Sequence, residues 1–491
     1  MWVEMKNSNN NIEFLPVTKK RASELLYDKV CEMIIQGKLN AKDKLPSERK
    51  MMQLFNRSQA TVREAMGMLE TSGYITINPG EGAYVNEITL HPIIQPLTEF
   101  INSQKVSFQE IFMFVKEAEA SFATIICTKR DDNDLLQLST TLDQIHLHTD
   151  ATPQMHRLIF SFHQQMISSI SNPIAVIIWA TIYNLLDNRW LSNLDISNVI
   201  NIHKYLLDAI STRNIDILQQ LLEDFWASVL DTPHVKNNVL CSNMEYEPPI
   251  SDDAVKENAM EPFTVYKISD IIYRQIKERI MKGHLVTGDK LPSERDLTLS
   301  FQCSRPSIRE ALRKLENDGY VTIIQGSGAV VCELSPYPVE KLLENVIRMN
   351  LITSDHLTII RNICDTMAIV WAAENRTAAE LKSIKSILDE MEEESDSIER
   401  NVTLSREFHA RVALASHNQL LCIINQIIWA VYYDRLIAYM YSLDAASIKD
   451  ALLRRSHDRH YILYESIEKR DPQKAKDNSL AHIKHITTKI D

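Results

Sequence analysis

The chain has 491 residues, a formal net charge of −12 and only ten glycines, where an average composition would give roughly 34. Such a shortage excludes collagen-like runs, several phosphate-cradling loops and a βαβ array rich in tight turns. Seven cysteines without a CxxC pair argue against zinc-finger and disulfide frameworks. The N-terminus has no apolar signal core, and the longest apolar run, near 174–182, is half a membrane span. We therefore expect a cytoplasmic protein without a membrane partner.

The chain repeats itself at an offset of 246 residues. LPSERKMMQLFNRSQATVREAMGMLETSGYITINPGEGAYV at 45–85 aligns without a gap with LPSERDLTLSFQCSRPSIREALRKLENDGYVTIIQGSGAVV at 291–331. The offset also pairs residues of the parts that follow: Glu119 with Asp365, Arg130 with Arg376, and His163 with His409. Beyond these it grows to 257, which pairs His203 with His460. A repeat at this period predicts two copies of one module.

Each module is expected to have a short N-terminal part and a longer helical part. We predict six segments in chain order: a disordered tail (1–18), a first winged helix-turn-helix domain (19–88), a first helical bundle (89–233), a linker (234–263), a second winged domain (264–335) and a second helical bundle (336–491). Proline, asparagine and acidic residues without apolar periodicity indicate the linker. The fold class is therefore mainly α.

The N-terminal part is clearest in the second copy. Isoleucines on one stripe predict a helix over 265–282, and Gly283 follows as a C-cap candidate. Ser293 precedes a short helix, a break at 302–304 follows, and a second helix is expected over about 305–317. YVTIIQGSGAVV then alternates apolar residues around a Gly-Ser-Gly turn, which indicates a hairpin. This order of elements is that of a winged helix-turn-helix.

Arginines line the second of these short helices. Arg305, Arg309 and Arg313 are four residues apart and share one helical face. In helix-turn-helix proteins this element enters the major groove, where guanidinium groups grip phosphates or pair with guanine. An arginine stripe can also be merely a solvated face. The wing and the second copy favour DNA binding, and the acidity of the chain lies outside both winged domains, which are slightly basic.

These residues resemble the GntR family of bacterial transcription regulators. LPSER at 291–295, the stretch 304–312 and the glycine pair of the wing match the family signature. The resemblance implies that the following residues contact operator DNA: Arg295, Arg305, Ser307, Arg309, Gly326 and Gly328 in the second copy, with Arg49, Thr61, Arg63 and Gly82 in the first.

The first copy departs from the family pattern at two positions. Gln59 stands where the family has arginine, and Gly67 aligns with Arg313. Because glutamine can pair with adenine, we expect the first winged domain to bind more weakly or with a different base preference. A degenerate copy kept only for protein–protein contact is the alternative.

The longer part of each module lacks glycine. Residues 106–230 and 339–490 are rich in helix formers, which predicts all-α bundles. They resemble the FCD ligand-binding domain of the FadR-like branch of the family, through Arg361 and Asp365 on the first long helix and Phe408-His409 at the centre.

The resemblance implies a divalent metal in the second bundle, held by three histidines and by an Asp or Asn four residues before the first of them. His409, His460 and His482 occupy the histidine positions, and Ser405 replaces the carboxylate. His460 and His482 each lie 11 residues from Asp471, so two antiparallel helices would bring them level. Three imidazoles suit Zn or Ni, with water in the open position. The alternative is a set of core histidines bonded to carboxylates, water or an anionic ligand.

The first bundle differs at the same positions. It carries Ile159, His163, His203 and Phe225, and phenylalanine cannot bind a metal. We expect this pocket to hold no metal, and either to bind an apolar ligand or to serve dimerisation.

The resemblance implies a transcription regulator controlled by a small effector, commonly an organic acid. Family members work as homodimers on palindromic operators, and this chain carries two winged domains and two bundles. We predict an intramolecular pseudo-dimer, with further homo-dimerisation left open. The competing hypothesis is a metal-dependent enzyme that uses the three histidines to activate water. No carboxylate lies in an obvious general-base position, which argues against that enzyme.

Overall fold

The computed structural model describes residues 22–86, 91–237 and 268–487, apart from short gaps at 36–37, 72–73, 79, 149, 187, 192–193, 282, 325–327, 349–350, 394–397 and 443–445. The expected tail (1–18), residues 238–263 of the expected linker and Gly326 lie outside the described residues. The chain divides into two compact units between Thr89 and Leu90.

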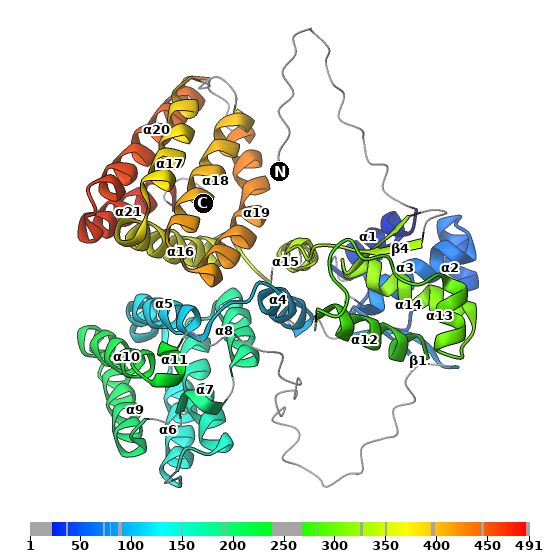
Figure 1. Cartoon of the computed structure of the whole chain (residues 1–491), viewed down its shortest axis with the longest axis horizontal. Coiled ribbons are helices and arrows are strands. Elements are labelled where there is room, and N and C mark those ends of the chain that lie inside the picture. Colours follow the sequence, from blue (N-terminus) through cyan, green and yellow to red (C-terminus); the bar gives the residue numbers. More distant parts are fainter. Residues whose placement is uncertain are drawn as a thin grey trace. The chain divides into compact units, whose positions relative to one another are not determined.

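The first winged domain forms the first unit. Its elements are α1 (Ala22–Ile35), α2 (Glu48–Phe55), α3 (Gln59–Thr71), β1 (Ile75–Asn78) and β2 (Gly82–Val85) (Figure 1). The strands pair antiparallel, with Ile75 opposite Val85. Asn56 closes α2 in the left-handed conformation, at φ 48°, and so makes the turn between α2 and α3.

The second winged domain has the same elements in the same order. They are α12 (Ile268–Met281), α13 (Glu294–Ser300), α14 (Arg305–Asn317), β3 (Val321–Ile324) and β4 (Gly328–Val331). Val321 pairs with Val331, and Gln302 adopts the left-handed turn conformation that Asn56 has in the first copy. Ile272, Ile276, Ile308 and Leu315 are among its buried core residues. The predicted order of helices and wing is therefore found in both copies.

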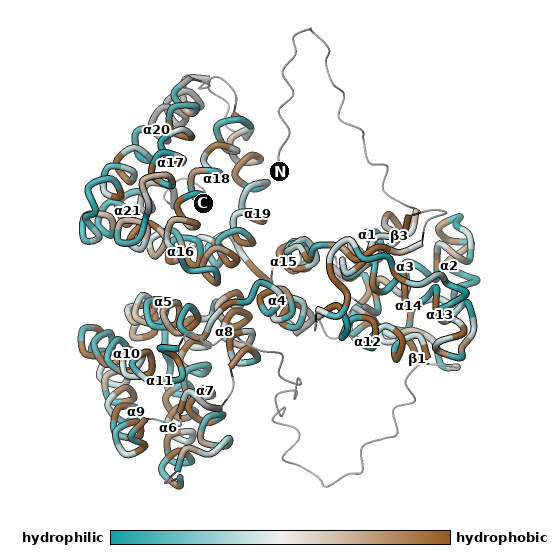
Figure 2. The backbone as a smooth tube through the Cα atoms, viewed as in Figure 1, coloured by the Kyte–Doolittle hydropathy of each residue, from teal (hydrophilic) through white to brown (hydrophobic). Residues whose placement is uncertain are grey.

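The first bundle consists of eight α-helices among the described residues and one short 3-10 turn. They are α4 (His91–Ser103), α5 (Phe108–Lys129), α6 (Asp132–His146), α7 (Pro153–Ser168), α8 (Pro173–Leu185), the turn Asn188–Leu191, α9 (Ile196–Ser211), α10 (Ile215–Leu230) and α11 (Pro233–Lys236). Helix α11 extends past residue 233, where the sequence suggested a linker, because Val235 is buried in the core. Figure 2 shows hydrophilic and hydrophobic residues alternating along these helices, as amphipathic packing requires.

The second bundle consists of α15 (Tyr337–Arg348), α16 (Ser354–Asn375), α17 (Ala378–Glu393), α18 (Ile398–Ala415), α19 (Gln419–Ser442), α20 (Ala446–Glu468) and α21 (Pro472–Thr487). Within α19, Gln419–Ala438 has the length and composition of a membrane span, and more than half of that stretch is buried inside the protein. Such burial is what a core helix of a bundle shows.

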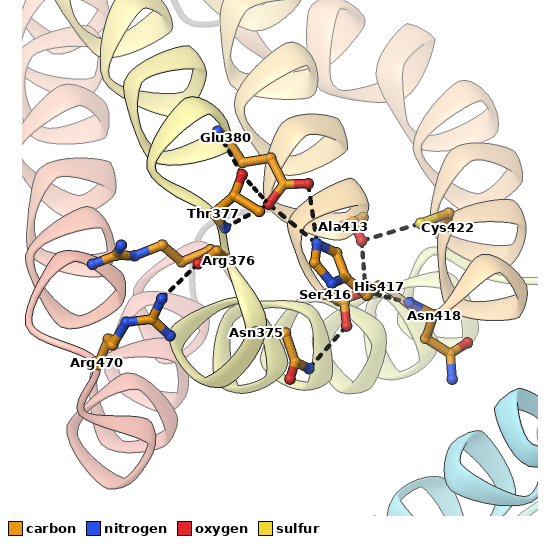
Figure 3. A network of polar contacts seen from close by, with 10 residues as sticks. All are labelled: Asn375, Arg376, Thr377, Glu380, Ala413, Ser416, His417, Asn418, Cys422 and Arg470. Carbon is orange, nitrogen blue, oxygen red and sulfur yellow. Dashed lines mark hydrogen bonds and ion pairs between the residues drawn. The ribbon is translucent and has the colours of Figure 1, made fainter.

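A reciprocal pair of arginines fastens the helix ends of each bundle. In the second bundle Arg376 donates to the carbonyls of Ile467 and Glu468 at the end of α20, and Arg470 donates to the carbonyls of Glu374 and Arg376 at the end of α16. Figure 3 shows Arg376 and Arg470 beside each other, next to the His417–Glu380 contact. Arginine at a helix C-terminus satisfies carbonyls that have no partner within the helix.

The first bundle has the same reciprocal pair of arginines, an arrangement that we call the arginine clamp. Arg130 donates to the carbonyls of Ile210 and Ser211, and Arg213 donates to those of Cys127 and Thr128. The sequence offsets of 246 and 257 relate the four arginines of the two clamps. The two bundles therefore share one helical frame.

The two bundles contact each other through equivalent residues. The Asn172 side chain donates to the carbonyl of His356 at 3.0 Å, and the Asn418 side chain donates to the carbonyl of Glu110 at 2.9 Å. The 246-residue offset carries Asn172 onto Asn418 and Glu110 onto His356. A contact in which each copy offers the same surface is the pattern of a twofold-symmetric dimer interface.

Candidate functional site

Helix α14 presents the arginine face of the second winged domain. Ser304 caps its N-terminus and lies 2.9 Å, oxygen to oxygen, from the hydroxyl of Ser307. Arg305, Arg309 and Arg313 are exposed. Arg309 pairs with Glu294 of α13 at 2.9 Å, which holds its guanidinium against the preceding helix. Arg305 and Arg313 make no hydrogen bond or ion pair within the part of the chain that the structure describes.

Helix α3 has the same length and a different face. Arg63 pairs with Glu48 at 2.9 Å, as Arg309 does with Glu294. Gln59 donates to the same Glu48 carboxylate at 3.3 Å. The Thr61 hydroxyl lies 2.9 Å from that of Ser58, the position that Ser304 has in the second copy.

The remaining predicted DNA contacts lie on the neighbouring helix and on the wing. Arg49 and Arg295 are exposed in the first turns of α2 and α13. Gly82 and Gly328 open the second wing strand with φ of 110° and 97°, a conformation that other residues rarely adopt. In each copy, therefore, the predicted residues that the structure describes belong to the first short helix, the second short helix and the wing of one small domain.

The second bundle brings its three predicted histidines together. His409 of α18, His460 of α20 and His482 of α21 are buried, and one nitrogen of each lies within 4.8 Å of the others. The Nε2 atoms of His409 and His460 are 3.2 Å apart. Two nitrogens bound to one tetrahedral zinc at about 2.0–2.1 Å would lie about 3.4 Å apart, so the observed spacing fits a shared ion. The residues present therefore fit a metal.

Neighbouring polar groups orient this histidine cluster. The Nδ1 of His409 lies 3.3 Å from the Asp365 carboxylate, which also accepts hydrogen bonds from Asn425 and Trp429. A carboxylate behind a histidine is the usual way to fix the ring of a metal ligand. The Ser405 hydroxyl lies 3.2 Å from Nε2 of His460, so Ser405 also lies at the cluster.

Arg361 adds a buried positive charge beside Asp365, the carboxylate behind His409, and its effect on the cluster did not follow from the sequence. Its side chain is 1% exposed and lies 3.3 Å from Asp365 without hydrogen-bond geometry. The guanidinium stacks over the rings of Trp429 and Tyr432, and its Nε and Nη2 have no hydrogen-bond partner among the described residues. A buried guanidinium with free donors is suited to bind an anion.

Burial and charge set the protonation of the site. Burial alone would raise the pKa of Asp365, but His409 and Arg361 lower it to about 2. The pKa of His482 lies well below its usual value, because the ring is buried and faces His460, His409 and Arg361. Asp365 is therefore ionised and His482 neutral near neutral pH, and neutral imidazole is the form that binds metals.

The first bundle closes the equivalent place with aromatic side chains. Glu119 occupies the position of Asp365 and accepts hydrogen bonds from Trp179 at 3.0 Å, Trp226 at 2.6 Å and His163 at 2.9 Å. All four side chains are buried. No sequence motif indicated this network, although the aligned carboxylate could have suggested a buried polar centre.

Phe225 takes the place of the third imidazole in the first bundle. Its ring centroid lies 5.3 Å from that of His163 and 5.0 Å from that of His203, and the two histidine rings are 5.2 Å apart. The corresponding histidine rings of the second bundle are 5.2 Å apart for His409 and His460. The ring of His482 lies 6.0 Å from that of His409 and 5.1 Å from that of His460, so the two ring clusters are similar in arrangement and differ in chemistry. Ile159, the position of Ser405, is fully buried and apolar.

Comparison with known proteins decides the family. The profile of the bacterial regulatory proteins of the gntR family matches residues 22–85 and 268–331, and the FCD domain matches 110–227 and 357–485, half of the chain by itself. This chain belongs to the GntR family. It carries two GntR winged domains and two FCD domains in tandem, and it is a transcriptional regulator of the FadR-like kind.

The relatives match one copy at a time. The HTH-type transcriptional regulator LutR of Bacillus subtilis is 28% identical over 215 residues, which is 42% of this chain and 94% of LutR. The HTH-type transcriptional repressor NanR of Klebsiella aerogenes is 29% identical over 188 residues, 37% of this chain and 69% of NanR. Among solved structures, Streptococcus agalactiae GntR is similar at 19% identity and a TM-score of 0.33, covering 43% of this chain and all of that one.

Family membership favours one of the two functions considered. GntR proteins bind operator DNA through the winged domain and take effectors in the FCD domain. The family and the relatives are transcription regulators, which supports a regulator over a metal-dependent enzyme.

Proposed function

We propose that this protein is a cytoplasmic regulator that binds its operator with both winged domains and takes one small organic acid in the second bundle. The residues proposed to contact DNA are those of the two short helices and of the wing in each copy: Arg49, Thr61, Arg63, Gly82, Arg295, Arg305, Ser307, Arg309, Gly326 and Gly328. Phosphate contacts by such arginines position a protein on DNA, and contacts to base edges select the sequence.

The observation that carries the effector site is the juxtaposition of Arg361 with the histidine cluster. His409, His460 and His482 would hold a divalent ion such as Zn²⁺ or Ni²⁺, with Ser405 beside it. The ion would offer an open position to an oxygen of the effector. The Nε and Nη2 donors of Arg361, which have no hydrogen-bond partner among the described residues, would bind a carboxylate of the same molecule.

The equivalent contacts between the bundles support an intramolecular pseudo-dimer. Asn172 and Asn418 each bridge to the opposite bundle, as two subunits of a homodimer would. Effector binding would change DNA affinity only to the extent that it favours one arrangement of the bundles over another.

The second winged domain has a direct route to the bundles. Glu99 of α4 accepts a hydrogen bond from Tyr320 and pairs with Lys277, and both belong to the second winged domain. Burial and the Glu99 charge raise the pKa of Tyr320, which keeps the phenol protonated as the donor. A charged contact of this kind would transmit a shift of α4 to the DNA-binding domain.

The test is footprinting of the full-length protein on the DNA that flanks its own gene. We expect protection of two half-sites, with affinity that changes when Zn²⁺ and a panel of small mono- and dicarboxylic acids are added. The Arg361→Leu variant should bind the same DNA and lose the response to acids. Protection of a single half-site would contradict the pseudo-dimer, and an unchanged acid response in Arg361→Leu would contradict the effector site.

A further inference from the structure

The two recognition helices share one backbone frame, so their side chains can be compared position by position. Helices α3 and α14 each have 13 residues and each begin after a serine. Each carries one arginine in its second turn, Arg63 or Arg309, paired at 2.9 Å with a glutamate of the preceding helix. Differences in DNA reading between the copies therefore arise from the other exposed positions.

The second recognition helix offers two additional cations. Arg305 is its first residue, and residues at the N-terminus of a recognition helix contact base edges. Arg313 lies eight residues further along the same face, about 12 Å away at 1.5 Å per residue. At that distance along the helix axis, Arg313 is placed to contact the DNA backbone and not the base pair that Arg305 reaches. Neither guanidinium is engaged elsewhere in the described part of the chain.

The first recognition helix lacks both cations. Gln59 is the first residue of α3 and shares the Glu48 carboxylate with Arg63, so its amide is oriented on the same face. Gly67 occupies the place of Arg313, and a Cβ added there would meet no atom within 4 Å. The backbone of α3 could therefore carry an arginine at this position, and the sequence supplies none.

We propose that the operator has two unequal halves, with guanine at the base that Arg305 reaches and adenine at the base that Gln59 reaches. Arginine pairs bidentately with O6 and N7 of guanine, and glutamine pairs with N6 and N7 of adenine. The second half-site also gains a phosphate contact from Arg313 that the first lacks. This inference rests on the operator binding proposed above.

Unequal halves give the DNA site a direction. A symmetric homodimer binds a palindrome equally well in both orientations, because its two recognition helices are identical. This chain distinguishes the two orientations, since exchanging the halves places adenine under Arg305 and guanine under Gln59. The protein therefore binds its operator in one orientation, with the second winged domain on the stronger half.

The experiment starts with selection of binding sites from random DNA by the full-length protein. We expect a two-part motif whose halves differ at one corresponding base pair, G·C in one and A·T in the other. The Gln59→Arg variant should convert A·T to G·C at that pair, with a change in relative affinity of about 5- to 150-fold. A motif with identical halves, or an unchanged preference in Gln59→Arg, would overturn the proposal.

The phosphate contact is tested by the salt dependence of binding. The Gly67→Arg variant should tighten binding without changing base preference, and should steepen the slope of log K against log salt concentration by about 0.9, as for one added phosphate contact. Gly67→Ala stabilises the helix without adding charge and should keep the parent slope. Gln137→Arg adds the same charge at an exposed position of α6 and should also keep the parent slope.

The outcomes separate this proposal from the function on which it rests. If Gly67→Arg leaves the salt slope unchanged, the assigned phosphate contact is wrong, although operator binding stands. If the parent protein selects no DNA sequence at all, operator binding itself fails and the unequal halves fail with it.

Discussion

The two bundles hold a carboxylate at the same place on their first long helix and surround it in opposite ways. In the first bundle Trp179, Trp226 and His163 form hydrogen bonds with Glu119, so that both oxygens of its carboxylate have partners. In the second bundle Asp365 lies between Arg361 and His409, and buried nitrogens of Arg361 and His482 lack hydrogen-bond partners among the described residues. The Nε2 atoms of His163 and His203 in the first bundle also lack such partners, so the buried guanidinium beside the carboxylate is what distinguishes the second bundle and suits it to bind an anion.

Aligned positions show where the two bundles differ. Where the second bundle has Thr358, Arg361, Asn425 and His482, the first has the larger or less polar residues Phe112, Val115, Trp179 and Phe225. All four replacements are 0–1% exposed, in an interior that tolerates few voids. Buried polar groups without partners destabilise a fold and persist where a ligand satisfies them. After duplication, one bundle could convert its pocket into packing while the other retained it.

The largest expected effect comes from removing the carboxylate of the first bundle. Glu119→Ala leaves the donors of Trp179, Trp226 and His163 buried without an acceptor. We expect it to lower the free energy of unfolding by about 3–5 kcal/mol. Denaturant unfolding followed by tryptophan fluorescence measures this, because Trp179, Trp190 and Trp226 lie in this core.

Two variants define what that result means. Glu119→Gln keeps an acceptor and should cost less than Glu119→Ala, whereas Asp143→Ala removes an exposed acid of α6 and should be near neutral. A loss below about 1 kcal/mol for Glu119→Ala would show that the network around Glu119 contributes little to the core.

Metal binding should distinguish the bundles next. We expect one Zn²⁺ or Ni²⁺ per chain, and a gain in stability of about 2.7 kcal/mol when the free ion is at a hundred times its Kd. Equilibrium dialysis with elemental analysis counts the ions. His460→Ala should abolish binding, and the matched substitution in the first bundle, His203→Ala, should leave one ion per chain. Two ions in the parent would contradict the closed pocket of the first bundle.

Acid sensitivity should trace in part to His203 of the first bundle. Burial, and secondarily the neighbouring His163, lower the pKa of His203 to about 3. Its ring faces Phe162, Phe225 and the carbonyl of Val199, with Glu119 reached only through His163. The same histidine has a pKa near 6.5 in the unfolded chain. Between about pH 3 and pH 6.5, His203 is therefore protonated in the unfolded chain and neutral in the folded chain. Stability attributable to His203 is present above pH 6.5 and falls as the pH drops, by about 1.4 kcal/mol per unit.

The measurement compares unfolding free energies at pH 7 and pH 5.5. His203→Leu should flatten the dependence relative to the parent, whereas His146→Leu, which removes an exposed histidine of α6, should keep it. Equal slopes in the parent and His203→Leu would show that His203 is solvated or protonated in the folded protein.

The sequence predicted the parts that depend on local pattern. Arg305 and Arg309 lie on one helix face because their spacing matches the helical repeat. His460 and His482 meet because each is 11 residues from the Asp471 turn, and their ring centroids are 5.1 Å apart. The duplication, the winged domains and the all-α bundles followed from the glycine distribution and from apolar periodicity.

The rest depends on contacts between distant residues. Nothing near Arg361 in the sequence indicates that its charge lowers the pKa of His482 on α21, because α21 is packed against α16 only in the fold. Glu119 is joined to tryptophans 60 and 107 residues away. The extension of the first bundle to Lys236 depends on burial of Val235, a tertiary effect that outweighs the linker-like composition around it.

The smallest expected effect tests whether the arginine clamps at the helix ends contribute equally to the stability of the two bundles. Arg130→Ala and Arg376→Ala each remove one arm of an arginine clamp and leave two carbonyls at a helix end to water. Each should lower local stability by about 1–2 kcal/mol, and the two losses should agree within about 0.5 kcal/mol. Hydrogen exchange of the α9–α10 and α20–α21 amides measures the two bundles separately.

Arg→Lys at either position keeps the charge but loses the planar guanidinium that donates to two carbonyls at once, so it should recover only part of the stability lost in the alanine variant. A gap of more than about 1 kcal/mol between the alanine variants would mean that divergence has reached the helical frame and is not confined to the pocket, because equal clamps in equal frames must respond equally.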